Sequence, residues 1–125
     1  MWTVGFKGIG AFFVTFLLAV GILAADKGKV CKPSANGTVD LCDAEDNFNG
    51  VLDQIDLDGN MNSASVQTKG YVEDLPYTGA PGLGWQELVA DGLGGVKPPE
   101  VAGTGRMFWV VSKDAGAGTL TVDLG

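Results

Sequence analysis

The longest apolar run of the chain lies near its start. Residues 9–25 contain no charged side chain, and Thr15 is their only polar residue. As a helix this run would be about 26 Å long, slightly shorter than the ~30 Å hydrocarbon core of a membrane. A helix that is apolar on every side has to be covered on every side, by lipid or by protein. The run therefore predicts a helix whose role depends on what covers it.

Three interpretations of this helix are open from the residues. A basic start, an apolar run and small residues before Asp26 are typical of a secretory leader that is removed. The same run can stay in a membrane as a single span, or it can pack against copies of itself. We favour the last interpretation. Small residues among the bulky ones would let helices approach closely, although this pattern suits a membrane span equally. The residues expected in these helix contacts are Gly10, Ala11, Phe13, Phe16, Leu17, Val20, Gly21 and Ala24.

The pattern after this run predicts shorter elements. Apolar residues at helical spacing indicate a short helix within residues 42–55, and residues 85–95 can form one or two helical turns. Residues 63–75 are typical of a strand with a bulge. The segments 106–114 and 119–124 are joined by Ala-Gly-Ala-Gly, and the second alternates apolar and polar residues, which predicts a β-hairpin.

Together these elements predict an α+β fold. We expect a long hydrophobic helix in residues 1–30, which serves as an anchor or as a filament core. Residues 31–125 are expected to form a small extracytoplasmic head with an antiparallel sheet at its C-terminal end. Glycine makes up 20 of the 125 residues, which favours many turns and short elements.

Charge divides the chain unevenly. Residues 1–32 carry four lysines and one aspartate, whereas residues 33–125 carry four basic and fourteen acidic residues. A head that acidic repels phosphate groups, so we expect no binding to nucleic acid. The lysines that follow the apolar run would place the head in the cytoplasm by the positive-inside rule. Two further features favour the outside of the cell.

These features are a pair of cysteines and a glycosylation sequon. Cys31 and Cys42 are eleven positions apart, a spacing that suits a small disulfide loop in an oxidising compartment. Two reduced thiols are the alternative. Asn36 begins the sequon Asn-Gly-Thr, which marks an exposed loop of a secreted protein. We therefore expect a location at the cell surface or outside the cell, with the helix anchored or inserted in the membrane before assembly.

One segment, residues 54–65, is similar to a metal-binding loop. With Gly59 aligned on the turn glycine of a calcium loop, Asp56, Asp58 and Asn62 take ligand positions. The first and last positions of that loop lack the carboxylates that calcium requires. We therefore expect no cofactor, with Ca²⁺ at these three residues as the alternative to a polar turn.

The motifs of catalysis are missing from the sequence. The chain contains no histidine to serve as a base, and its serines lie in no nucleophile motif. Pairs of carboxylates are better explained as parts of a solvated surface. We expect a protein that is not an enzyme.

The stretch FKGIGAFFVTFLLAVGILAA, residues 6–25, resembles the start of archaeal pilins and archaellins, which are type IV pilin-like filament subunits. In these proteins a basic residue and a glycine precede an unbroken apolar helix. The resemblance implies cleavage after Gly8, helices bundled in a filament core, and heads displayed outside. The expected function is a structural subunit of an extracellular filament, which contacts copies of itself through the helix and membrane lipid before assembly. The alternatives are a single-pass accessory subunit of a membrane complex and a secreted binding module with a removed leader.

Overall fold

The computed structural model describes residues 10–58 and 61–125, and strands dominate both ranges. The first five strands are β1 (Phe12–Leu18), β2 (Val30–Ala35), β3 (Thr38–Leu41), β4 (Gly50–Asp56) and β5 (Ser63–Lys69). Between β1 and β2 lies a 3-10 turn, η1 (Ala24–Asp26). The next five strands are β6 (Tyr71–Pro76), β7 (Gly84–Ala90), β8 (Val96–Lys97), β9 (Arg106–Asp114) and β10 (Thr119–Asp123).

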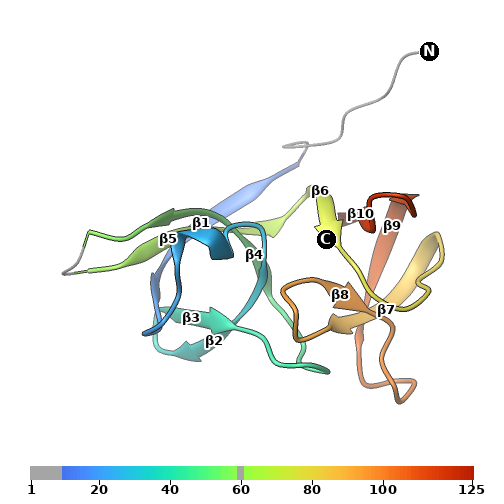
Figure 1. Ribbon diagram of the computed structural model, residues 1–125, viewed down its shortest axis with the longest axis horizontal. Helices are drawn as coiled ribbons and strands as arrows, with labels where there is room; N and C mark the ends of the chain where they lie inside the picture. Colours follow the sequence, from blue (N-terminus) through green and yellow to red (C-terminus); the bar gives the residue numbers. More distant parts are fainter. Residues whose placement is uncertain (1–9, 59–60) are drawn as a thin grey trace, which may run out of the picture.

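The first five strands close into a barrel in the order β1-β3-β2-β4-β5 (Figure 1). Strand β1 is antiparallel to β5, from the pair Phe12–Lys69 to the pair Leu17–Ser63. On its other side β1 is parallel to β3, and this pairing involves Leu17 and Leu18. The last two residues of β1 therefore close the barrel, and the residues before them have a strand neighbour on one side only within the described ranges.

The last five strands form a second sheet in the order β6-β10-β9-β7-β8, which lies beside the barrel in Figure 1. The chain passes from β5 to β6 at Gly70, whose φ of 88° is open mainly to glycine. The carbonyl of Gly70 accepts a hydrogen bond of 2.9 Å from the N–H of Leu124. This bond ties the C-terminal end of the chain to the junction between the barrel and the sheet.

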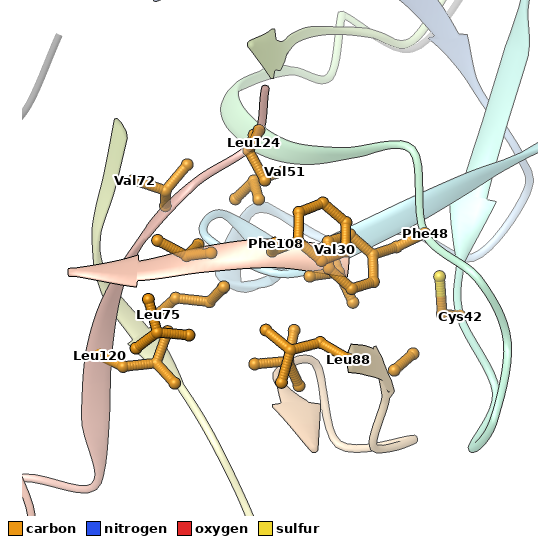
Figure 2. Close-up of a cluster of buried hydrophobic side chains, with 14 residues drawn as sticks. Val30, Cys42, Phe48, Val51, Val72, Leu75, Leu88, Phe108, Leu120 and Leu124 are labelled. Atoms are coloured by element: carbon orange, nitrogen blue, oxygen red, sulfur yellow. The ribbon is translucent and has the colours of Figure 1, made fainter. Parts of the chain in front are cut away.

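Two clusters of buried apolar side chains stabilise this arrangement. The smaller cluster lies inside the barrel and consists of Cys31, Val39, Leu52, Ala64 and Val66. The larger cluster joins barrel strands to the second sheet (Figure 2), and its members include Val30, Cys42, Phe48, Val51, Leu88, Phe108 and Leu120. Phe48, from the connection between β3 and β4, stacks on Phe108 of β9 with 4.9 Å between the ring centroids. The barrel and the sheet thus share the larger of the two clusters.

Backbone hydrogen bonds also join the barrel to the second sheet. The N–H of Val30 donates to the carbonyl of Gly94 at 3.0 Å. The N–H of Glu45 donates to the carbonyl of Ala90 at 2.9 Å, and the N–H of Ala90 donates to the carbonyl of Asp46 at 2.8 Å. Because backbone groups of both parts satisfy each other, neither part can be removed without leaving buried groups unpaired.

The predicted N-terminal helix is wrong. Residues 12–18 form strand β1, and the described residues contain no helix beyond the three-residue turn η1. Phenylalanine, valine and threonine fit the pleated surface of a strand well. Gly10 and Gly21 flank the strand with φ values of 65° and 98°, which a right-handed helix excludes. The α+β class is therefore corrected to all-β, and the resemblance to pilins fails together with the helix. Nor does any described helix have the length and hydrophobicity needed to cross a membrane.

Two further helical predictions are also wrong. Residues 42–55 contain most of β4, and residues 85–95 lie largely in β7. In both strands consecutive residues are buried, among them Val51 and Leu52 in β4 and Leu88 in β7. A strand that is covered on both faces is apolar at neighbouring positions, so its pattern overlaps with that of a short buried helix.

The predicted C-terminal hairpin is confirmed. Strands β9 and β10 are antiparallel, with Thr119 opposite Asp114 at the turn. The strand predicted within residues 63–75 is divided by Gly70 into β5 and β6. The expected cleavage site after Gly8 and the turn glycine Gly59 lie outside the described residues.

Candidate functional site

Strand β1 presents apolar side chains to solvent. Phe16 and Leu18 pack against the core of the barrel. Because side chains alternate along a strand, Phe13, Thr15 and Leu17 point outward. We define the N-terminal apolar surface as the exposed apolar residues of this part of the chain: Phe12 (59% exposed), Phe13 (45%), Leu17 (42%), Val20 (fully exposed) and Leu23 (63%). Exposed apolar residues that gather on one segment are a common mark of an interaction site.

The N-terminal part of β1 also has a free backbone edge. The N–H of Leu18 donates toward β5, and the N–H of Leu17 donates toward β3, to the carbonyl of Gly37 at 2.8 Å. Successive residues of a strand direct their peptide groups to opposite sides, so the N–H and C=O groups of Phe13 and Thr15 point away from β5. The pairing with β3 begins only at Leu17. No strand in the described part of the chain lies opposite these groups.

A groove of about 380 Å³ lies over β4 and β5 and reaches β1 at Thr15. It is lined by residues of β1, β4 and β5, and the polar ones are Thr15, Gln54, Asp56, Ser63 and Ser65. Their hydroxyl, amide and carboxylate groups can form hydrogen bonds with a bound segment. The groove therefore adds polar contacts beside the apolar side chains of β1.

The second sheet carries a pair of exposed tryptophans on its outer face. Trp85 of β7 lies opposite Trp109 of β9, with 5.3 Å between the rings and an angle of 84° between their planes. Phe108 and Val110 are buried in the core, so alternation along β9 directs Met107 and Trp109 outward. From the sequence, Trp85, Phe108 and Trp109 are expected to be core and interface residues, which holds for the buried Phe108, whereas the exposed pairing of the two tryptophans is not predicted. The sequence signal for an exposed tryptophan is the segment Met-Phe-Trp-Val-Val. Alternate residues of a strand point to opposite faces of the sheet, so only every second residue of this segment is buried.

Ion pairs fix the connection between β3 and β4. Lys32 Nζ lies 2.6 Å from Asp46 Oδ2, and Lys97 Nζ lies 3.0 Å from Glu45 Oε2. The hydrogen bond from Lys32 lowers the pKa of Asp46, and a hydrogen bond from the backbone N–H of Glu100 lowers the pKa of Glu45. Both carboxylates are thus held ionised in contacts that shape the fold.

The predicted disulfide is not formed in the structure, where Cys31 and Cys42 are free and buried. Cys31 lies in the barrel core, and Cys42 lies in the core shared with the second sheet. Leu41 is opposite Cys31 in the β2–β3 pair, and Cys42 follows Leu41, so the two thiols point to opposite sides. Burial raises the pKa of each thiol to about 12. Neither is a thiolate nucleophile near neutral pH.

The residues of the predicted calcium loop lie in the β4–β5 hairpin. Asp56 is the last residue of β4. A carboxylate oxygen of Asp58 accepts a hydrogen bond of 2.9 Å from the N–H of Met61, and the carbonyl of Asn62 accepts one from Leu18. Within residues 10–58 and 61–125, no three acidic, cysteine or histidine side chains converge to hold a metal. Calcium binding here stays a prediction, which melting curves with and without calcium test.

The residues expected in helix–helix contacts do not share one face. Phe16 points into the barrel, whereas Phe13, Leu17 and Val20 are exposed. The remaining residues lie outside the strand, with Gly10 and Ala11 before it and Gly21 and Ala24 after it. Only the exposed members of this set therefore remain candidates for contact with another molecule.

The predicted glycosylation site lies in an exposed turn. Asn36 is located between β2 and β3, and its carbonyl lies 3.5 Å from the hydroxyl of Thr38, which donates to it. Asparagine followed by glycine is a preferred sequence for a tight hairpin turn. The turn explains the Asn-Gly pair structurally, and glycosylation stays a prediction.

No protein family, no curated protein and no solved structure matches this chain. Functional inference therefore rests on the features described above. Of these, the N-terminal apolar surface, the free edge of β1 and the tryptophan pair contribute least to the fold itself.

Proposed function

We propose that this protein is a structural subunit that assembles with copies of itself through the N-terminal apolar surface. The observation that carries the proposal is the exposure of Phe12, Phe13 and Leu17 on one short strand, followed by Val20 and Leu23. Full burial of such a side chain contributes about 1.5–3 kcal/mol, and a side chain that is half exposed in the monomer can gain roughly half of that in a contact. In a monomer these side chains stay exposed to water, whereas an assembly buries them and is stabilised by this free energy.

The charge distribution supports contact through this surface. The chain has a net charge of −7, which makes most of its surface repel a second copy. Residues 9–25 contain no charged side chain. Two copies can therefore approach through this segment without placing like charges against each other.

The states of the ionisable groups also support a structural role. The carboxylates with a lowered pKa, Asp26, Glu45 and Asp46, all accept hydrogen bonds within the fold. Catalytic acids and bases usually have pKa values shifted toward the working pH. These carboxylates are shifted away from it, so we propose a function without acid–base chemistry.

The oligomeric state of the purified protein tests the proposal. We expect light scattering to show concentration-dependent assembly, and Leu17→Lys to raise the concentration for half-assembly at least about tenfold. Ser112→Lys is the matched control, because it adds the same charge to an exposed position of β9 in the second sheet, outside both the apolar surface and the groove. A wild-type protein that is monomeric up to about 100 µM would contradict the proposal.

The tryptophan pair favours a second candidate function, a binding module. Trp85 and Trp109 are 63% and 41% exposed, although tryptophan gains much from burial. The two indole rings are nearly perpendicular, so a planar or apolar ligand can stack on the face of one ring and contact the other ring beside it. Tryptophan fluorescence titrated with soluble oligosaccharides and aromatic compounds tests this candidate. A saturable change that Trp109→Ala abolishes supports it, and an unchanged spectrum with all probes contradicts it.

A further inference from the structure

We propose that the free edge of β1 is a strand-pairing site, and that its partner is β1 of a second copy. This inference rests on the proposed function, for which it names the contact between subunits. It is carried by the backbone of the strand, whereas the proposed function is carried by side-chain exposure.

The first step is that no strand among residues 10–58 and 61–125 uses the hydrogen-bonding groups on this edge. The peptide groups of Phe13 and Thr15 point away from β5, and the neighbouring strand β3 begins only beside Leu17. A row of such groups is a template on which another strand can add.

The second step is that the edge strands of the second sheet have features that prevent pairing with another strand, whereas β1 has none of these features. Strand β6 contains Asp74 and Pro76, and β8 is two residues long and is followed by Pro98 and Pro99. Charges, prolines and short length are the usual means of preventing edge pairing. Residues 12–16 contain no charge, no proline and no glycine. Among the described strands, β1 thus combines a free edge with a sequence that favours pairing.

The third step identifies the partner as a second copy. Cross-strand neighbours of like charge destabilise a sheet, and neighbours without charge do not. Each copy has a net charge of −7, yet its β1 strand is uncharged. Pairing of β1 with β1 therefore brings two acidic molecules together at a place where neither contributes a charge.

The free groups also select one register. An antiparallel pair with its two-fold axis at Val14 places Phe13 of each copy opposite Thr15 of the other. Residues that face each other in this way exchange both N–H···O=C hydrogen bonds. This register uses the free groups of Phe13 and Thr15 in both copies, which is the self-complementarity that a two-fold interface requires.

The length of this pairing is limited by the fold. Leu17 already donates to Gly37, and Gly10 has a φ of 65° that turns the chain away before β1. The shared ladder is therefore confined to residues 12–16. Directly opposite side chains lie on the same face of a sheet, so Phe13 of one copy would cover Thr15 of the other, beside the polar groove.

Proline at position 15 tests the pairing. The N–H of Thr15 points to the free edge, so Thr15→Pro removes that donor and leaves the hydrogen bonds between β1 and β5 intact. Thr15→Val is the matched control, because it keeps the N–H and a β-branched side chain. We expect the concentration for half-assembly of Thr15→Pro to be at least about tenfold higher than that of Thr15→Val, which loses the hydroxyl but keeps the N–H.

Hydrogen exchange of the wild-type protein gives a second measurement that does not depend on how the proline variant folds. We expect the amides of Phe13 and Thr15 to exchange at least about tenfold more slowly in assembled than in dilute protein. If the protein assembles while these amides keep their exchange rate, the pairing is wrong and the proposed function stands. If the wild-type protein is monomeric at every concentration, both the pairing and the proposed function are wrong.

Discussion

A Cβ atom on Gly70 would lie 2.6 Å from the Cα atom of Ala11. The backbone before β1 therefore lies directly against the junction between β5 and β6. The carbonyl of the same glycine accepts the hydrogen bond from Leu124. Three distant parts of the chain thus meet at one residue without a side chain.

Replacing Gly70 with alanine should therefore be strongly destabilising. The substitution adds a backbone clash to the cost of a φ of 88°, and we expect a loss of about 2–4 kcal/mol in the free energy of unfolding. Urea denaturation of the purified variant measures this loss.

Gly28→Ala is the matched control for this prediction. Gly28 has the same φ of 88°, but an added Cβ would meet no atom within 4 Å. The control isolates the cost of the backbone conformation, about 1–2 kcal/mol. Equal losses in the two variants would show that the contact with Ala11 is unimportant.

The shared core predicts that the barrel and the second sheet unfold together. Leu52 is fully buried in the barrel, and Leu88 is fully buried in the core between barrel and sheet. Each substitution by alanine should cost about 2–5 kcal/mol and should shift one common transition. Far-ultraviolet circular dichroism and tryptophan fluorescence, recorded in the same urea series, should report the same midpoint.

Leu93→Ala is the control for these two variants. Leu93 is at a 75% exposed position, so this substitution should change the free energy of unfolding by less than about 0.5 kcal/mol. Two separated transitions in Leu52→Ala would contradict the shared core.

Stability should decrease in acid. Asp26, Glu45 and Asp46 have a lowered pKa in the folded protein, from ordinary values of 3.8, 4.5 and 3.8. The folded state therefore binds fewer protons than the unfolded state when these groups titrate. Their contribution is fully present above the unfolded pKa values and is lost as the pH falls through the folded ones. We expect the free energy of unfolding to decline below about pH 4.5.

Asp46→Asn tests the source of this decline. The variant removes the ion pair with Lys32 and should make the free energy of unfolding less dependent on pH in this range. Asp56→Asn removes one charge from the end of β4 and serves as the control. A pH dependence that is the same in all three proteins would exclude a main contribution from Asp46.

The two thiols should be unreactive in the folded protein. Cys31 and Cys42 are buried, and burial raises the pKa of each to about 12. At pH 8 a thiol reagent should modify them only as fast as the protein unfolds. In urea without reductant, both thiols should react at once. Fewer than two reactive thiols per chain under that condition would mean that the protein contains the disulfide first predicted.

The β-hairpin at the C-terminus could be predicted, because its turn residues and alternating pattern are local. Strand β1 could not be predicted in the same way. Residues 9–25 are apolar at both inward and outward positions, since Phe16 points into the barrel while Phe13 and Leu17 face solvent. A strand that is apolar on both faces shows no alternation of apolar and polar residues. An apolar segment of this length therefore has the same sequence pattern as a membrane helix.

The relative position of the two cysteines is a second feature that could not be predicted from the sequence. Eleven positions suit a disulfide loop, but the hairpin of β2 and β3 places Cys31 opposite Leu41 and not opposite Cys42. A shift of one residue in a strand reverses the side to which a side chain points. That register depends on pairing across the barrel, which the local sequence does not report. The candidate surface around β1 was similarly found as an apolar segment, with its free edge visible only after the strand order was known.

The pairing of Phe12 with Lys69 has a consequence for synthesis on the ribosome. Strand β1 is made before its partner, because Lys69 follows Phe12 by more than fifty positions. Until β5 has been made, the apolar and uncharged strand β1 has no partner in this ladder, as happens in other folds with many distant contacts. On a polysome, the nearest equivalent segments belong to copies made from the same message. The order of synthesis thus leaves β1 of each nascent chain able to meet β1 of a neighbouring chain until its own β5 has been made.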